Sequence, residues 1–143
     1  MKSSGGSSSH RVFIAVPLQK SSEPAYRNIL QKFQKNFESA RAIPFENAHL
    51  TLRFLSSVDD AGVQKLKDTL DGLSGLSSPF NVSWQRIGMF KFSNSVWVGP
   101  VHSEPLLNSL HRNICHAIHK AGFGLPDKRF RPHITFARFP ARS

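Results

Sequence analysis

Short apolar runs alternate with segments of helical periodicity along this chain. The run Val12–Val16, closed by Pro17, predicts a buried strand. Ser22-Glu23-Pro24 is typical of a helix start, and apolar residues then recur at helical spacing as far as Phe37. From His49 to Leu55 the pattern is again that of a strand.

The same alternation continues to the end of the chain. Apolar residues on one face predict a second helix over about residues 60–73. Alternating apolar and polar residues indicate a half-buried strand from Phe80 toward Phe90. The remaining elements are a turn at 93–95, a strand at 96–98 stopped by Gly99-Pro100, a helix opened by Ser103-Glu104-Pro105 and closed by Gly122, and a last strand at Pro132–Ala137.

The two halves of the chain repeat one order of features. Each half runs from a strand through a proline and a Ser-Glu-Pro helix start to a helix and a His-x-Thr motif. The proline and the histidine are 32 residues apart from Pro17 to His49 and 33 residues apart from Pro100 to His133. This repeat predicts two pseudo-equivalent strand-helix-strand lobes, each of which delivers one motif to a shared cleft.

Length and composition favour one globular domain over residues 11–143, since 39% of the 143 residues are hydrophobic and 20% are charged. Residues 1–10 are rich in serine and glycine, and we interpret them as a flexible tail or a cloning remnant outside the fold. No apolar run is long enough for a membrane span. A single cysteine, Cys115, excludes an intramolecular disulfide and fits a cytosolic or nuclear protein.

The charge of the chain changes the picture of its partners. Nineteen Lys and Arg residues against nine Asp and Glu residues give a formal net charge of +10 and a pI near 10.5. Such an excess favours a polyanionic partner, with nucleic acid well ahead of a membrane surface. We expect a nucleic-acid partner and no membrane.

The two His-x-Thr motifs carry the candidate chemistry. On a strand, residues two apart point to the same face, so His49 projects with Thr51 and His133 projects with Thr135. A neutral imidazole can act as a base while a protonated one acts as an acid, and threonine hydroxyls can bind phosphate oxygens. Two of the chain's three threonines follow a histidine in this way, which argues against coincidence. The four side chains suit phosphodiester chemistry without a metal.

The other histidines do not form a comparable set. His111, His116 and His119 fall on the third predicted helix, and we expect them to be solvated rather than to bind a metal. Cys115 has no partner that would make it a nucleophile, and a small, partly buried role is expected for it.

Several further residues are candidates for substrate binding. Arg53 has the parity of the first motif and Arg131 that of the second, so either could bind a phosphate, although a solvated strand end explains each equally well. Arg138 has the opposite parity and is less favoured. Phe90 and Phe92 are the best candidates for contacting a base, against the alternative of hairpin packing.

Four segments resemble one known family: 11–16 (RVFIAV), 48–55 (AHLTLRFL), 96–99 (VWVG) and 131–138 (RPHITFAR). They are similar to the RNA 2',3'-cyclic phosphodiesterases, also called the 2'-5' RNA ligase family, within the 2H phosphoesterases. The resemblance covers roughly residues 11–138. It implies a bilobal, pseudo-symmetric α+β fold in which antiparallel sheets line a central cleft and helices lie outside.

The resemblance also implies an activity. It is hydrolysis of an RNA 2',3'-cyclic phosphodiester, or of a cyclic nucleotide, to a 2'-phosphomonoester without a metal or other cofactor. His49 would protonate the leaving 3' oxygen, His133 would activate water, and Thr51 and Thr135 would hold the phosphate. Family members usually continue past the second motif, whereas this sequence ends at Ser143, so we expect their C-terminal strands to be absent.

Two alternatives stay open at this point. The domain could bind RNA or a nucleotide without turnover. It could instead trim RNA 3' ends by attack of a neighbouring 2' hydroxyl, but relatives of that kind usually carry His-x-Ser, and threonine at both positions favours the cyclic phosphodiesterase. We expect a monomer.

Overall fold

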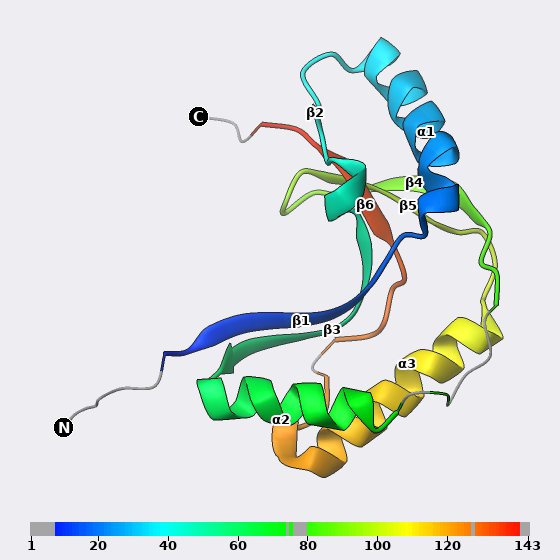
Figure 1. Ribbon diagram of the computed structural model, residues 1–143. Helices are drawn as coiled ribbons and strands as arrows, with labels where there is room; N and C mark the ends of the chain where they lie inside the picture. Colours follow the sequence, from blue (N-terminus) through cyan, green and yellow to red (C-terminus); the bar gives the residue numbers. More distant parts are fainter. Residues whose placement is uncertain (1–7, 74, 76–79, 127, 141–143) are drawn as a thin grey trace. The chain divides into compact units, whose positions relative to one another are not determined.

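The strands form a sheet that is accompanied by helices, an α+β fold as predicted. The computed structural model describes residues 8–73, 75, 80–126 and 128–140. Within them the strands form a six-stranded sheet of order β1-β3-β6-β5-β4, and β2 pairs with β6 (Figure 1). The pairs β2–β6, β3–β6, β4–β5 and β5–β6 are antiparallel. The elements are β1 (His10–Pro17), α1 (Glu23–Asn36), β2 (Arg41–Ala42), β3 (His49–Val58), α2 (Asp60–Asp71), β4 (Trp84–Phe90), β5 (Ser95–Pro100), α3 (Pro105–Ile118) and β6 (Ile134–Arg138), with short helical turns η1 (Lys20–Ser22), η2 (Phe45–Asn47) and η3 (His119–Phe123).

The chain divides into two compact units. The first unit comprises the described parts of Met1–Ile14, Leu52–Asn81 and Glu104–Phe130, and the second comprises those of Ala15–Thr51, Val82–Ser103 and Arg131–Ser143. Each half of the sequence therefore contributes to both units. Both motifs belong to the second unit, so the prediction that each lobe delivers one His-x-Thr motif was wrong. Pairing between β3 and β6, distant in sequence, brings the motifs into one unit.

An apolar core holds the first unit together. The helices α2 and α3 contact each other, and the core side chains come from these helices and from the adjoining strand segments. Burial of such aliphatic side chains is the main favourable term in folding. The buried members are Ile14, Leu55, Val58, Leu66 and Ile118.

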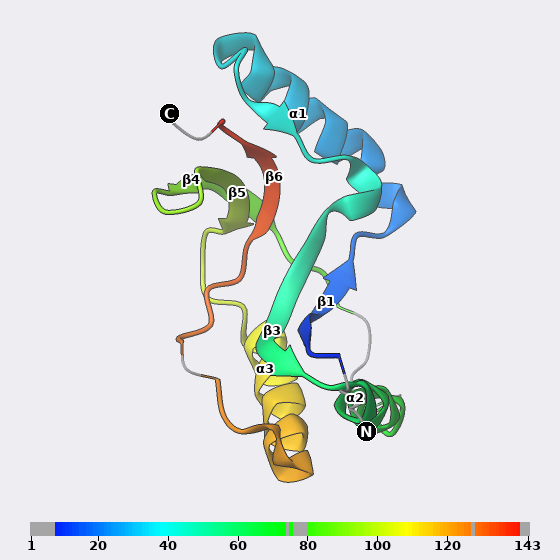
Figure 2. The same ribbon diagram turned by 90° about the vertical axis from the view of Figure 1, so that its left-hand side faces the viewer.

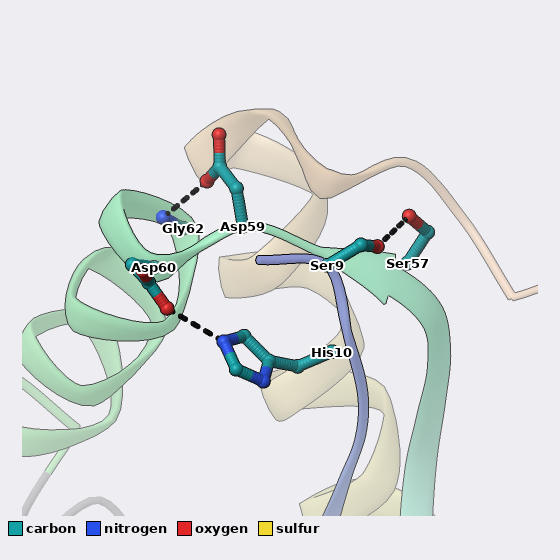
Figure 3. A network of polar contacts seen from close by, with 6 residues as sticks. All are labelled: Ser9, His10, Ser57, Asp59, Asp60 and Gly62. Atoms are coloured by element: carbon teal, nitrogen blue, oxygen red, sulfur yellow. Dashed lines mark hydrogen bonds and ion pairs between the residues drawn. The ribbon is translucent and has the colours of Figure 1, made fainter. Parts of the chain in front are cut away.

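Polar contacts attach the beginning of β1 to α2 and to the end of β3 (Figure 3). His10 Nε2 lies 2.6 Å from the Asp60 carboxylate, and the Ser9 and Ser57 hydroxyls share a hydrogen bond. Asp59 caps α2 by accepting the Gly62 N–H at 2.8 Å. The fold therefore begins before residue 11, since β1 starts at His10, and the boundary predicted for the tail was too late. Residues 1–7 of that tail lie outside the described residues.

Aromatic packing joins α1 to the sheet in the second unit, where β5 lies beside β6 (Figure 1 and Figure 2). Phe136 of β6 is fully buried and meets Phe33 of α1 edge to face at 5.4 Å between ring centroids. The buried Tyr26 hydroxyl donates to the Ile43 carbonyl at 2.6 Å, and burial raises the pKa of Tyr26 to about 12.

Two predicted strand boundaries differ from those observed. The segment Phe80–Ser83 is not a strand, and β4 begins at Trp84, which pairs with Pro100 at the end of β5. Proline lacks the N–H that a longer ladder would need, which explains why the pairing of β4 with β5 ends at Trp84. The last strand begins at Ile134 rather than Pro132, which leaves His133 directly before it. Among the described residues, no helix is long and apolar enough to cross a membrane.

Candidate active site

The two motifs meet where β3 pairs with β6. Leu50 lies opposite Ile134, and both side chains are buried. Successive side chains of a strand alternate between faces, so the histidines and threonines of both motifs project to the other face of this pair. If this antiparallel register is continued by one residue in each direction, each histidine would lie opposite the threonine of the other motif. Such a register would make the two histidines diagonal neighbours, with about 7–8 Å between their backbones, a spacing suited to bracketing a phosphate.

The two imidazoles make matching contacts. His49 Nδ1 lies 2.7 Å from the Asn47 carbonyl oxygen, and His133 Nδ1 lies 2.7 Å from the Arg131 carbonyl oxygen. A carbonyl only accepts, so each Nδ1 carries the proton and donates it. The contact orients each ring and assigns proton exchange to Nε2 in both cases.

Local backbone structure explains why the two contacts match. Asn47 ends the helical turn η2 just before β3 begins, and Arg131 precedes Pro132, which favours an extended backbone at Arg131. In both places a strand begins within three residues of the carbonyl that accepts the hydrogen bond from the ring. Both rings are half-buried.

Two aromatic side chains surround His133. Phe90 of β4 meets the imidazole edge to face at 4.8 Å between ring centroids, and Trp97 of β5 lies 6.2 Å away. Gly88 lies opposite Trp97, and a Cβ at this position would collide with the indole, so only glycine fits there. The structure thus brings Phe90 to the candidate site, while its predicted contact with a base stays a prediction. Trp97 is a neighbour that the sequence pattern did not single out.

A β-bulge changes the role expected for Arg138. The register between β5 and β6 shifts between Val96 and Trp97. Trp97 lies opposite Thr135, but the bulge places Arg138 opposite Ser95, which shares a face of β5 with Trp97. Arg138 therefore projects on the same face as the motifs. The prediction from strand parity that it projects on the opposite face was wrong. A bulge depends on pairing with a second strand, so strand periodicity alone could not reveal it.

The two arginines predicted to bind substrate lie in different surroundings. Arg53 is only 6% exposed, and its guanidinium donates to the carbonyls of Gly124 at 3.2 Å and Phe123 at 3.5 Å. These contacts fasten the loop after α3 within the first unit. The Arg131 side chain is exposed, and its backbone carbonyl is the group that contacts His133. Substrate binding by either guanidinium stays a prediction.

The expectation that His111 is solvated was wrong. Its ring is half-buried, stacks on Phe130 at 3.9 Å between centroids, and lies 3.3 Å from Cys115 Sγ. Burial lowers the pKa of His111 and raises the pKa of the Cys115 thiol. His116 and His119 are exposed. Within the described part of the chain, no group of three or more His, Cys, Asp or Glu residues is arranged to hold a metal ion.

Sequence comparisons point to one family. Residues 19–143 match the model of the 2'-5' RNA ligase superfamily. A protein from Archaeoglobus fulgidus named RNA 2',3'-cyclic phosphodiesterase is 30% identical over 131 residues, which cover 90% of this chain and 72% of that protein. A protein of the same name from Geobacillus stearothermophilus is 32% identical over 135 residues, but the match spans only 41% of its length.

Solved structures of similar fold agree with this family. The protein TT0787 of Thermus thermophilus has a TM-score of 0.74 and 25% identity, with 94% of this chain and 76% of that chain covered. Escherichia coli LigT complexed with 3'-AMP has a TM-score of 0.71 and 25% identity, with 95% and 78% covered.

Proposed function

Because the chain belongs to the 2'-5' RNA ligase superfamily, we propose that it hydrolyses RNA 2',3'-cyclic phosphodiester ends to 2'-phosphomonoesters. The relatives named RNA 2',3'-cyclic phosphodiesterase support this substrate class. The positive charge of the chain, +10 at pH 7, supports a polyanionic substrate. The reaction proposed here needs no metal ion.

The matched histidines are the observation that carries the proposal. Each donates through Nδ1 to a carbonyl 2.7 Å away, so each offers Nε2 for proton transfer on the same face of the β3–β6 pair. One neutral and one protonated imidazole on either side of a phosphorus can act together as base and acid.

The proposed step balances as follows. His133 Nε2 accepts a proton from water as the water oxygen bonds to phosphorus. The bond from phosphorus to the 3' oxygen breaks, and His49 Nε2 gives that oxygen its proton. The products are a 2'-phosphomonoester and a free 3' hydroxyl. Proton exchange with solvent then returns His49 to its charged form and His133 to its neutral form.

The neighbouring side chains are proposed to hold the phosphate. Thr51 and Thr135 would donate hydroxyl hydrogen bonds to its non-bridging oxygens, and Arg138 would place a guanidinium on the same face. These groups stabilise negative charge without exchanging protons, so their loss should weaken rather than abolish the reaction.

The test is turnover of an RNA oligonucleotide that ends in a 2',3'-cyclic phosphate, run with EDTA in excess. We expect one molecule of water to add per RNA end, seen by mass spectrometry, and a 2'-phosphate rather than a 3'-phosphate in the ³¹P NMR spectrum. The same oligonucleotide with a plain 3' hydroxyl serves as the control and should stay intact.

Each other outcome has a distinct meaning. Loss of turnover in EDTA that a divalent ion restores would contradict the metal-free step. Binding of the RNA without any product would make this a binding domain. Shortening of the control RNA would identify a 3'-end trimming phosphodiesterase.

A further inference from the structure

The turn between β4 and β5 carries an unusually exposed aromatic side chain. Phe92 lies in this turn, which covers residues 91–94, and its relative exposure is 103%. Lys91 beside it is also exposed. Burial of a large apolar side chain lowers the free energy, so this fully exposed ring, next to a cation, is available to bind a ligand that covers it.

Hydrogen bonds fix the shape of this turn. Asn94 adopts a left-handed backbone with φ of 54°, and its carbonyl accepts the Phe139 N–H at 3.0 Å. The Ser93 and Ser95 hydroxyls are 2.7 Å apart. Phe139, directly after β6, thus holds the turn in place, and the backbone that carries Phe92 has a fixed conformation.

Basic side chains continue from this turn across the sheet. Ser95, the first residue of β5 after the turn, lies opposite Arg138, and Arg138 lies opposite Arg41 of β2. Like charges directly opposite each other on paired strands are unfavourable. The ion pairs found among the described residues include neither arginine. A polyanion would relieve this repulsion.

The combination of a base-sized aromatic side chain with neighbouring cations matches single-stranded nucleic acid. Bases stack on exposed aromatic rings, and lysine and arginine bind the phosphates between them. Arg138 follows Thr135 by three residues, about 10 Å along an extended strand. The basic surface therefore begins about one nucleotide away from a terminal phosphate bound at the motifs.

We propose that Arg41, Lys91 and Phe92, here called the hairpin platform, bind the single-stranded RNA that precedes the terminal cyclic phosphate, with a base stacked on Phe92. This inference rests on the proposed function for its substrate. It adds that the protein distinguishes an RNA end from a free cyclic nucleotide, because only the RNA reaches the platform.

The kinetic test compares two substrates: a 2',3'-cyclic mononucleotide and an oligonucleotide that ends in the same cyclic nucleotide. For the oligonucleotide, Phe92→Ala should raise KM about tenfold and leave kcat unchanged, since stacking contributes to binding and not to the chemical step. Kinetics on the mononucleotide should not change. Phe92→Trp should restore the wild-type KM, because tryptophan also stacks.

Exposed residues elsewhere supply matched controls. Leu106→Ala on α3 removes an apolar side chain that is 63% exposed, and Lys67→Ala on α2 removes an exposed lysine. Neither should alter KM for the oligonucleotide. The proposed platform is contradicted if Phe92→Ala leaves KM for the oligonucleotide as unchanged as Leu106→Ala does. It is also contradicted if the wild-type protein has no lower KM for the oligonucleotide than for the mononucleotide.

A binding measurement separates failure of the platform from failure of the proposed function. Fluorescence anisotropy with an oligonucleotide that ends in a 3' hydroxyl needs no turnover. Arg41→Ala and Lys91→Ala should each reduce the slope of log K against log salt by about 0.7, as expected for one phosphate contact on a single strand. Unchanged slopes contradict the platform. Absence of hydrolysis by the wild-type protein, with the slopes reduced, contradicts only the enzymatic function.

Discussion

The two units use histidine in different ways. In the second unit, His49 and His133 sit at strand entries, where each ring donates to a carbonyl two residues earlier and Nε2 is assigned to proton exchange. In the first unit, His111 stacks on Phe130 and contacts Cys115 within one helical turn. The first arrangement leaves Nε2 of each ring for the proposed proton exchange, whereas the second fills space between a helix and a loop.

Arginine shows the same division. Arg53 in the first unit is buried against backbone carbonyls, while Arg138 in the second unit is exposed on the face that carries the motifs. Strand parity favoured Arg53 over Arg138 as a neighbour of the motifs. The comparison teaches that the neighbours of a side chain across the fold, more than its place on a strand, decide whether it is buried against the backbone or exposed beside the motifs.

The largest expected effect separates the histidines of the two units. His49→Ala and His133→Ala should each lower kcat on cyclic-phosphate RNA by about 10²–10⁴, the usual contribution of a general acid or base. The free energy of unfolding should change little, because each ring is half-buried and its hydrogen bond is local. Single-turnover kinetics and urea unfolding measure the two quantities.

The combination of the two substitutions gives a further check. The double variant should lose less than the product of the single losses, because residues that act as a unit are not additive. The pH profile of kcat/KM should be bell-shaped, with limbs that belong to the pair rather than to single residues. Wild-type kcat in either single variant, on a folded sample, would falsify the mechanism.

The two arginines should also differ, one in its effect on stability and the other in its effect on activity, and both effects should be smaller than those of the histidines. Arg53→Met leaves the carbonyls of Phe123 and Gly124 without their donor, which should cost about 1–3 kcal/mol of stability. Arg138→Met should leave stability unchanged but lower kcat/KM by about 10- to 100-fold, if its guanidinium bonds to the phosphate. Thermal unfolding and kinetics on the same samples decide this. The assignment fails if Arg138→Met is the destabilised variant.

Phe90 sharpens the comparison within the second unit. Edge-to-face contacts contribute about 0.5–1.5 kcal/mol, so Phe90→Ala should lower kcat by about two- to tenfold through a less restrained His133 ring. The ring-current shift of the His133 protons in NMR spectra of the free protein should fall with it. Ile87→Ala, an exposed residue of the same strand with the opposite parity, is the control. A change in KM alone would instead support the predicted base contact.

Local patterns predicted the elements that carry the motifs. The alternation that sets His49 with Thr51 and His133 with Thr135 leaves Leu50 and Ile134 for the opposite face, and both are buried. Pro24 lies in the first turn of α1 as expected. These features depend on residues near one another in sequence. The spacing of His49 and His133 identified the pair because each motif is complete within three residues.

The features that the sequence did not predict depend on contacts between residues that are distant along the chain. The bulge that turns Arg138 arises from pairing with β5, and the stack of His111 on Phe130 joins residues on either side of a loop. The division of β3 between two units after Thr51 depends on the packing of the whole chain. No periodicity within one strand or helix encodes such contacts.

The smallest expected effect concerns His111 and pH. Burial lowers its pKa below the usual 6.5, the charges of Arg53 and Arg112 act in the same direction, and a backbone hydrogen bond at Leu52 partly opposes them. In the unfolded chain His111 binds a proton more readily than in the fold, so stability should fall as pH drops below about 6.5 and level off below the folded pKa.

His111→Gln should remove this part of the pH dependence, whereas His116→Gln, an exposed residue of the same helix, should retain it. Urea unfolding of the three proteins between pH 7 and pH 5 measures the difference. At pH 7 the folded fraction of His111→Gln should turn over cyclic-phosphate RNA at the wild-type rate, because this ring fills space and does not exchange protons with substrate. Equal pH slopes in all three proteins, or a loss of kcat in His111→Gln comparable to that of His49→Ala, would remove the distinction between the histidines of the two units.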